Sequence, residues 1–365
     1  MRKIFAALLL MTFPALTHAQ FNWSANYFEV GVGAGIMNYS GELTNSIFDF
    51  KHLHPAGALF VRYNVGKFIS VRGQAALGFI SGNDADSKEL RNNIRNLNFQ
   101  SHVLEGSLIL EANLMGYNPT GHDQMFSPYA FIGIGVFNFN PRTAHFDPNK
   151  DGELIELSKL NTEGQGSATL SNRKPYSRTQ ISIPMGLGVK FAVNSHINIG
   201  FEVGIRPTFT DYLDDVGQTY PIDALTKEPL YDNTAYRGGE FGDKSMQELL
   251  SDRSYEYIYQ VIQNDANVNA DLAPIKDMSY SEYLNYITPL LAMDPTSISD
   301  ANDLAAVNNH ESYIDARGGS LVRGDKANDW YLMTMITVSY NFIDNGLVGF
   351  RKRRKRKAGC KSAQF

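Results

Sequence analysis

The sequence predicts an all-β protein, an eight-stranded antiparallel up-and-down transmembrane β-barrel with a small helical insertion in its last extracellular loop. Three observations lead to this prediction. The 365 residues include 19 Tyr, 22 Phe and 31 Gly, a composition typical of outer-membrane barrels. The N-terminus has an export signal, and no later apolar run is long enough for a membrane-spanning helix. Finally, eight segments alternate apolar residues with small or polar ones.

The first 19 residues have the pattern of a signal peptide. Arg2 and Lys3 form the basic region, Ile4–Phe13 is a short apolar stretch, and Ala19 ends a run of residues suited to cleavage after it. The single cysteine, Cys360, lies far from this point, so we do not expect a lipoprotein. An exported chain does not meet nucleic acid. We therefore exclude nucleic acid as a partner and expect the protein in the cell outer membrane, in contact with its lipid.

Each predicted strand shows lipid one face and the barrel lumen the other. In the seventh strand, isoleucine, phenylalanine and valine occupy the odd positions from Ile197 to Ile205, and polar or small residues occupy the even ones. The predicted strands are Tyr27–Asn38, Ala56–Asn64, Ile69–Ser81, Ser101–Met115, Pro128–Asn140, Thr179–Val193, Ile197–Phe209 and Asp329–Ile343. Together they assign residues 20–343 to the barrel domain.

Short and long connections alternate between these strands. The long ones are Tyr39–Pro55, Gly82–Gln100, Pro141–Arg178 and Thr210–Asn328, with a short connection between each pair. Bacterial barrels have short periplasmic turns and long external loops. With an even number of strands, we expect both termini of the mature chain in the periplasm.

Charged residues of both signs fall on the lumen face of the predicted strands. The lumen of an eight-stranded barrel is only wide enough for side chains to fill, and an isolated buried charge is costly. We therefore predict a structural network of ion pairs, with a proton or ion path as the alternative. Its members are Glu29, Arg62, Arg72, Glu105, Glu111, Lys190, Glu202 and Arg206.

The fourth long loop contains the predicted helical insertion, at about residues 244–310. Ser245–Gln263 and Ser279–Met293 have the apolar spacing of helices, and Asn302–Asn308 suggests a third, short helix. Its role stays open between a lid over the barrel mouth and a surface for docking a partner.

Three segments of the chain resemble one family. They are FEVGVGAGIMNYSGEL (Phe28–Leu43), PTFTDYLDDVGQTY (Pro207–Tyr220) and RGDKANDWYLMTMITVSYNF (Arg323–Phe342), and they are similar to PorG-like outer-membrane barrels of the type IX secretion system. The resemblance covers most of the barrel, from Phe28 to Phe342, and omits most of the helical insertion. It implies a non-enzymatic component that associates with a periplasmic ring, built from a lipoprotein and its partner, and supports assembly or anchoring of the machine.

The last segment, residues 344–365, is strongly basic although the chain has a formal net charge of -5. A run of like charges repels itself and stays extended. We expect it in the periplasm, either near anionic inner-leaflet headgroups or docked on an acidic face of the ring. Cys360 beyond it is expected to form an intermolecular disulfide or to stay a free thiol. The basic residues are Arg351, Lys352, Arg353, Arg354, Lys355, Arg356 and Lys357.

Calcium is the one cofactor that the sequence suggests. Asp147, Asn149 and Asp151 occupy positions 1, 3 and 5 of a calcium-binding loop, and Gly152 supplies the turn at position 6. Position 12 is Ser158 where a bidentate glutamate belongs, so a plain polar turn explains the segment equally well. A second acidic group (Asp211, Asp214 and Asp215) lacks a clear fourth metal ligand. The resemblance to PorG-like barrels implies that this group shapes the loop at the barrel rim.

Two alternatives to a secretion component are a generic surface barrel for adhesion or envelope stability and, as a minor option, a lipid-modifying enzyme. The nearest approach to a catalytic group is Ser101 and His102 with Glu105. Adjacent residues of a strand point to opposite faces, so Ser101 and His102 cannot act together. We therefore expect no enzyme.

Overall fold

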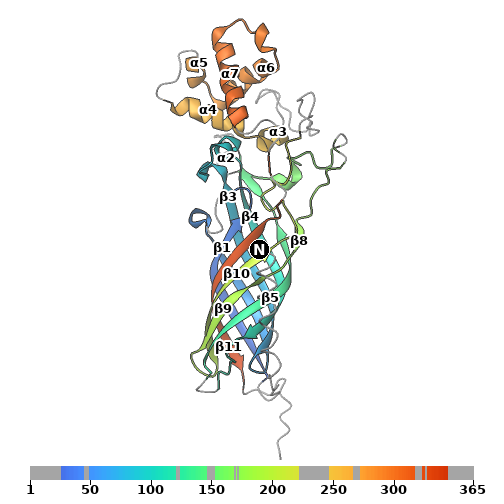
Figure 1. Cartoon of the computed structure of the whole chain (residues 1–365), viewed down its shortest axis with the longest axis vertical. Helices are drawn as coiled ribbons and strands as arrows, with labels where there is room; N and C mark the ends of the chain where they lie inside the picture. The colour runs from blue at the N-terminus through green and yellow to red at the C-terminus, as the bar shows by residue number, and fades with distance from the viewer. Residues whose placement is uncertain are drawn as a thin grey trace, which may run out of the picture.

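A closed ring of antiparallel strands forms the body of the computed structural model (Figure 1). The structure describes residues 26–44, 49–120, 124–145, 153–167, 170, 172–221, 246–265, 272–316, 323–324 and 327–343. The predicted signal peptide, the possible calcium ligands at 147, 149 and 151, and the basic tail with Cys360 lie outside these residues. Among the described helices, none combines the length and apolar character needed to cross a membrane.

Eight walls close the ring, which confirms the predicted fold. In ring order the walls are β1 (Tyr27–Ser40), β2 (His54–Val65), β3 (Ile69–Asn83), β4 (Asn98–Asn113), β5 (Phe126–Phe139), β8 with β9 (Thr179–Ser182 and Met185–Ala192), β10 (Ile197–Pro207) and β11 (Trp330–Phe342). β11 then pairs with β1 from Phe28↔Phe342 to Ser40↔Trp330, which closes the barrel. Every neighbouring pair is antiparallel.

The sixth wall differs from the single strand predicted over Thr179–Val193. It is divided into β8 and β9 at Ile183 and Pro184, although both pieces pair with β5 in one register. Proline has no N–H to donate to a ladder, which accounts for the interruption. Its carbonyl still accepts a hydrogen bond from the Gly133 N–H at 2.7 Å. The wall therefore continues through the break, and the hydrogen bond that is missing is the one that an N–H at position 184 would donate.

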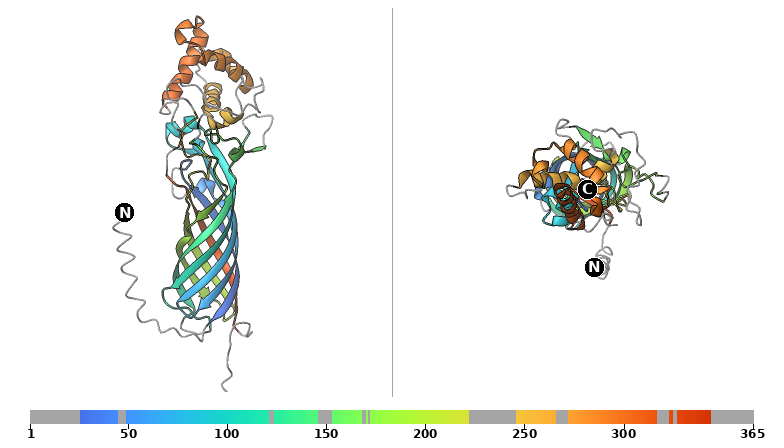
Figure 2. Two further views of the ribbon diagram at one scale, coloured as in Figure 1. Left: turned by 90° about the vertical axis from the view of Figure 1, so that its right-hand side faces the viewer. Right: turned by 90° about the horizontal axis from the view of Figure 1, so that it is seen from above.

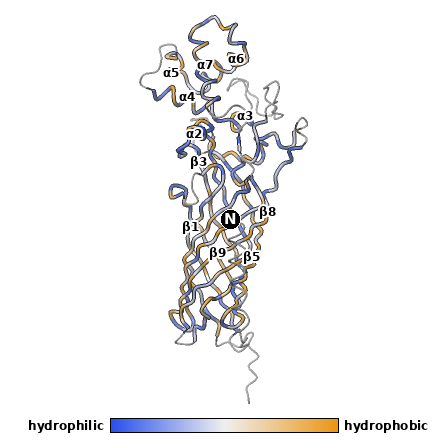
Figure 3. Tube along the Cα trace, in the orientation of Figure 1, coloured by the Kyte–Doolittle hydropathy of each residue, from blue (hydrophilic) through white to orange (hydrophobic). Residues whose placement is uncertain are grey.

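The outer surface of the barrel is apolar. Along β10, Ile197, Ile199 and Phe201 are exposed, whereas the alternating Asn198 and Glu202 are buried inside. The tube coloured by hydropathy has apolar stretches along the barrel strands and more polar colour in the loops above them (Figure 3). Apolar groups outside and charges inside are the reverse of the arrangement in a water-soluble protein and are typical of a barrel in lipid.

Short elements and a helical cap extend the barrel at one end (Figures 1 and 2). The rim contains the 3-10 helices η3 (Phe50–His52), η4 (Asp84–Asp86) and η6 (Leu157–Lys159), the helix α2 (Leu90–Arg95) and the hairpin β6 (Arg142–Ala144) with β7 (Leu154–Glu156). The cap contains α3 (Met246–Ser251), α4 (Ser254–Asn264), α5 (Ala273–Lys276), α6 (Tyr280–Leu291), η9 (Pro295–Ser297) and α7 (Ala301–Ala316).

The cap follows the predicted helices with two changes. The first predicted helix is divided into α3 and α4 around Arg253, and the third is longer than predicted and continues to Ala316. α6 begins with a capping box, in which Ser279 and Glu282 each satisfy the backbone N–H of the other. One apolar core runs from upper barrel residues such as Tyr331 into cap residues such as Leu284. The cap is therefore packed onto the barrel mouth.

Candidate functional site

All eight charged residues predicted for the lumen are buried inside the barrel, and ion pairs join them into two groups. In the larger group Arg62 pairs with Glu29 and, through Nε, with Glu111 at 2.9 Å. Arg72 pairs with Glu202 and with Glu111 at 3.1 Å. These residues come from β1, β2, β3, β4 and β10, so the network ties distant walls together across the lumen.

Lys190 and three neutral side chains complete the larger group. Lys190 lies 3.6 Å from Glu111 and also contacts the rings of Tyr117 and Tyr129, with its Nζ 4.8 and 5.0 Å from their centroids. The Tyr129 hydroxyl donates a 2.5 Å hydrogen bond to Glu202. Tyr117 belongs to a short turn and donates to Asn198 at 2.7 Å, which fills the lower end of the lumen.

The smaller group lies higher in the barrel. Arg206 Nε is 3.6 Å from Glu105 Oε2, and the same carboxylate accepts hydrogen bonds from Tyr331 at 2.6 Å and Ser182 at 3.1 Å. With both groups in place, the interior consists of packed, paired side chains. A buried ion pair of this kind fixes geometry more than it adds stability, because both charges lose their hydration.

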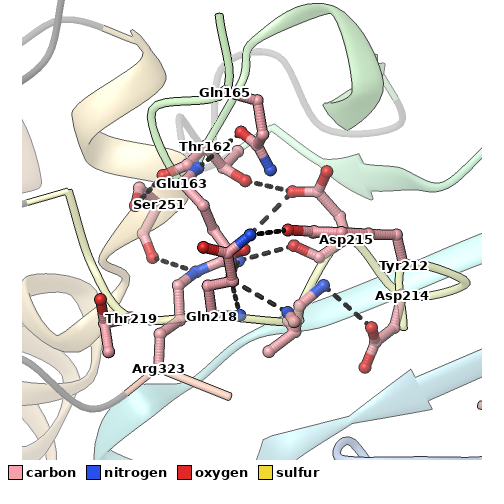
Figure 4. Close-up of polar contacts among 12 residues, drawn as sticks. Thr162, Glu163, Gln165, Tyr212, Asp214, Asp215, Gln218, Thr219, Ser251 and Arg323 are labelled. Atoms are coloured by element: carbon pink, nitrogen blue, oxygen red, sulfur yellow. Dashed lines mark hydrogen bonds and ion pairs between the residues drawn. The ribbon is translucent and has the colours of Figure 1, made fainter. Parts of the chain in front are cut away.

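A second polar cluster, which we call the rim network, is centred on Arg323 above the barrel (Figure 4). Arg323 is 1% exposed and donates from Nη1 to Glu163 at 2.8 Å and to the Asp215 carbonyl at 2.6 Å, and from Nε to the Ser251 carbonyl at 3.2 Å. Its own carbonyl accepts a hydrogen bond from Arg95. One arginine thereby links the second, third and fourth long loops to the start of the cap.

Supporting bonds hold the partners of Arg323. The Glu163 carboxylate also accepts from the backbone N–H groups of Gly217 and Gln218, each at 3.0 Å. Asp215 accepts from Tyr176 at 2.6 Å and from Thr162. Burial raises the pKa of the Asp215 carboxyl to about 6, against the opposing effect of Arg323.

The Tyr39 hydroxyl lies between two buried carboxyl groups next to the rim network. It is 2.7 Å from Asp214 Oδ2 and 2.8 Å from Asp329 Oδ1. A hydroxyl has one hydrogen, so it can donate to only one carboxylate, and the second carboxyl must be protonated to donate in return. Burial raises the pKa of Asp214 to about 7, and burial together with Asp214 raises the pKa of Asp329 well above its usual range. The pair therefore retains a proton.

A third carboxyl group extends this acidic cluster. Glu42, Asp211 and Asp329 bring one carboxylate oxygen each within 4.8 Å of one another. Burial, followed by Asp214 and Asp329, raises the pKa of Glu42 to about 11. Carboxylate oxygens are the ligands that calcium prefers, so among the described residues this group has the donor chemistry for a cation.

The sequence points to parts of these clusters. The sequence shows one acidic group, which consists of Asp211, Asp214 and Asp215. In the structure Asp214 binds Tyr39, Asp215 binds Arg323, and Asp211 lies near Glu42 and Asp329. Ser101 points into the lumen, where it accepts from the Asn140 N–H at 2.9 Å, while the neighbouring His102 belongs to the opposite face. Ser101 and His102 therefore lie on opposite faces of the strand, as predicted from their adjacent positions in it.

Several important residues are not predicted by the sequence pattern. Arg323, Arg95, Glu163 and Tyr39 lie in loops or at a strand end, where alternation carries no information. The one available signal is that Tyr39 and Arg323 fall within the segments of the family resemblance.

The apolar outer wall, the charged interior and the closed ring define the class of this protein as a membrane-spanning β-barrel. The chain belongs to the outer membrane protein beta-barrel domain family, whose sequence signature matches residues 5–227. This membership assigns the protein to the outer membrane.

Solved structures of other outer-membrane proteins are distantly similar. Neisserial surface protein A matches with 12% identity and a TM-score of 0.29, covering 49% of this chain and 82% of that one. Ail of Yersinia pestis, in complex with a heparin analogue, has 12% identity, a TM-score of 0.26 and coverages of 49% and 85%. OprG of Pseudomonas aeruginosa has 15% identity, a TM-score of 0.26 and coverages of 52% and 84%. No curated protein matches the chain.

Proposed function

We propose that this protein is a non-enzymatic component of the type IX secretion system that anchors or assembles the periplasmic ring at the outer membrane. One observation carries the proposal. Tyr39, Asp214 and Asp329 each come from a different one of the three segments that resemble PorG-like barrels, and they meet at one hydroxyl. A resemblance scattered over about 300 residues of sequence thus corresponds to one buried junction in space.

The lumen supports a structural role over transport. Its eight charged side chains are paired and at most 3% exposed, which leaves no room for a protein substrate. The partner contact in this proposal is therefore made by a surface of the protein. We assign it to the basic tail on the periplasmic side, where seven consecutive cations from Arg351 to Lys357 would meet an acidic face of the ring lipoprotein or its partner.

Deleting residues 346–365 tests this proposal. We expect the barrel to insert normally while secretion and co-purification of the ring are lost. A matched control replaces each arginine of the run by lysine and each lysine by arginine, which keeps the charge and should preserve both activities. Normal secretion and ring recovery without the tail would remove the proposed contact.

Cys360 offers a way to identify the partner directly. Under oxidising conditions we expect a disulfide-linked adduct between Cys360 and a ring protein, which Cys360→Ser abolishes. Recovery of the monomer alone would indicate that Cys360 remains a free thiol, and it would weaken the docking proposal.

A surface barrel for adhesion or envelope stability is the second candidate, because the cap extends the barrel on the side of the long loops (Figure 2). Replacing residues 246–316 by a short linker separates the two functions. If the protein acts in secretion alone, both secretion and surface attachment should be unchanged. If the cap is an adhesive surface, attachment should be lost while secretion is unchanged.

A further inference from the structure

The first long loop lies against the outer face of the barrel wall. Met37 and Tyr39 of β1 point into the lumen, so Asn38 between them points outward. An outward residue of this barrel should be exposed, yet Asn38 is only 1% exposed. Its Nδ2 donates to the carbonyl of Asp49 at 2.9 Å and to the carbonyl of His52 at 3.4 Å. Residues Asp49–Leu53, which we call the loop 1 clasp, therefore cover the wall at this level.

Charged side chains also fix the clasp to the second long loop. His52 has a carboxylate at each ring nitrogen, with Nδ1 2.7 Å from Asp49 and Nε2 3.5 Å from Asp86. Lys51 Nζ is 2.5 Å from the other oxygen of Asp86. Beyond the clasp, His54 contacts Ser81, an outward residue of β3 that is itself only 8% exposed. The clasp is thus held at both ends.

Phe50 belongs to this tethered segment and is exposed to solvent. At 81% it is the most exposed large apolar side chain among the residues that the structure describes. The carbonyls of Asp49 and His52 accept hydrogen bonds from Asn38, so the backbone that carries the ring is fixed against the wall. An apolar ring fixed in this way is unfavourable in water and needs an apolar environment.

The level of the clasp indicates what that environment is. The last exposed apolar residue of β1 is Ile36, two residues before Asn38, and that of β3 is Phe79, two residues before Ser81. Two residues of strand span about 7 Å. The clasp therefore begins where the lipid-facing belt ends, and Figure 1 shows this blue loop at the side of the barrel, below α2.

We propose that Phe50 inserts into the boundary between headgroups and acyl chains of the outer leaflet, so that the loop 1 clasp extends the lipid-contacting surface sideways from the wall. Aromatic rings favour this boundary in membrane proteins. The surface is continuous with the apolar belt, which argues for lipid rather than for a separate protein partner. Asn38 and His52 act in this arrangement as positioning residues that keep the ring at the correct height.

The test uses one fluorescent label in a background that carries Cys360→Ser. Phe50→Cys, labelled with an environment-sensitive dye, is reconstituted in phosphatidylcholine vesicles that contain lipids brominated either near the headgroup or near the chain end. Leu59→Cys on the lipid-facing wall is the deep control, and Met293→Cys at an exposed apolar position of the cap is the aqueous control. Circular dichroism verifies that each variant is folded.

We expect headgroup-proximal bromine to quench the Phe50 label at least twofold more than the Met293 label, and deep bromine to quench the Leu59 label most. Adding Asn38→Ala should reduce the quenching at position 50 without changing that at Leu59. Quenching at position 50 no greater than at Met293 overturns the proposal. A blue-shifted emission without bromine quenching also overturns it, since a protein surface would then cover the ring.

Discussion

The lumen and the rim of this barrel accommodate buried charge in different ways. In the lumen, carboxylates such as Glu111 face guanidinium and ammonium groups at ion-pair distance, so each charge has a partner of opposite sign. At the rim, Asp214 and Asp329 share one hydroxyl, and a retained proton takes the place of a cation. The lumen is thus arranged for permanent cohesion, whereas the stability of part of the rim depends on its protonation state.

The largest effect is expected from breaking the lumen network. Glu111→Gln removes the carboxylate that contacts Arg62, Arg72 and Lys190. Glu29 and Glu202 still pair with the two arginines, so the group is left with one uncompensated buried positive charge. We expect a loss of about 3–5 kcal/mol in the free energy of unfolding. Urea unfolding in lipid vesicles measures this loss.

Leu110→Ala is the matched control for that experiment. Leu110 is adjacent on the same strand but faces outward and is 51% exposed. Its substitution should cost far less than Glu111→Gln. Equal losses would mean that the network contributes no specific cohesion.

Breaking the rim network should release the loops and leave the barrel intact. Arg323→Met removes three donated hydrogen bonds, to Glu163, Asp215 and Ser251, and an ion pair with Asp215. We expect a local loss of about 3 kcal/mol. Hydrogen exchange should rise in the rim and cap while the barrel strands stay protected. Arg323→Lys keeps the charge but not the fork of donors, so an intermediate result is expected. Deprotection that spreads equally to the barrel strands would contradict the separation of rim from wall.

The acidic pair of the rim gives a pH dependence of defined sign. The folded rim raises the pKa of Asp214 to about 7 from its ordinary 3.8, so the folded state binds the proton more tightly than the unfolded state. Rim stability should therefore be highest below about pH 4, fall as the pH rises toward about 7 and change little above that for this group. Protease sensitivity of the loops as a function of pH measures the trend.

Asp214→Asn is the control variant, because its amide can donate to the Tyr39 oxygen at every pH. It should flatten the profile between about pH 4 and 7. An unchanged slope in this variant would assign the pH dependence to other groups of the rim.

The smallest effect is expected at an exposed ion pair. Lys51 is 66% exposed in its side chain and pairs with Asp86 at 2.5 Å. Solvent screens such a pair, so Lys51→Ala should leave the free energy of unfolding almost unchanged. A loss comparable to that of Glu111→Gln would show that burial is not what distinguishes these pairs.

The barrel is predictable because alternation is a strong, local signal. Period-two patterns locate eight walls, and the interruption that they miss is at Pro184, whose lack of an N–H divides a ladder without moving the strand. The same alternation assigns Glu29 and Arg72 to the lumen face, where both are buried. Residues of the rim follow no period, so Arg323 and Arg95 give no comparable signal.

By itself, the sequence determined the number of walls, the face that each side chain occupies and the sign of the charges inside. Only the tertiary structure decided which charges meet. Arg62 reaches both Glu29 and Glu111, and Arg323 reaches Glu163 across 160 positions of sequence. The physical reason is that alternation reports direction relative to one strand, whereas a contact across the barrel depends on the registers of all strands between the two residues.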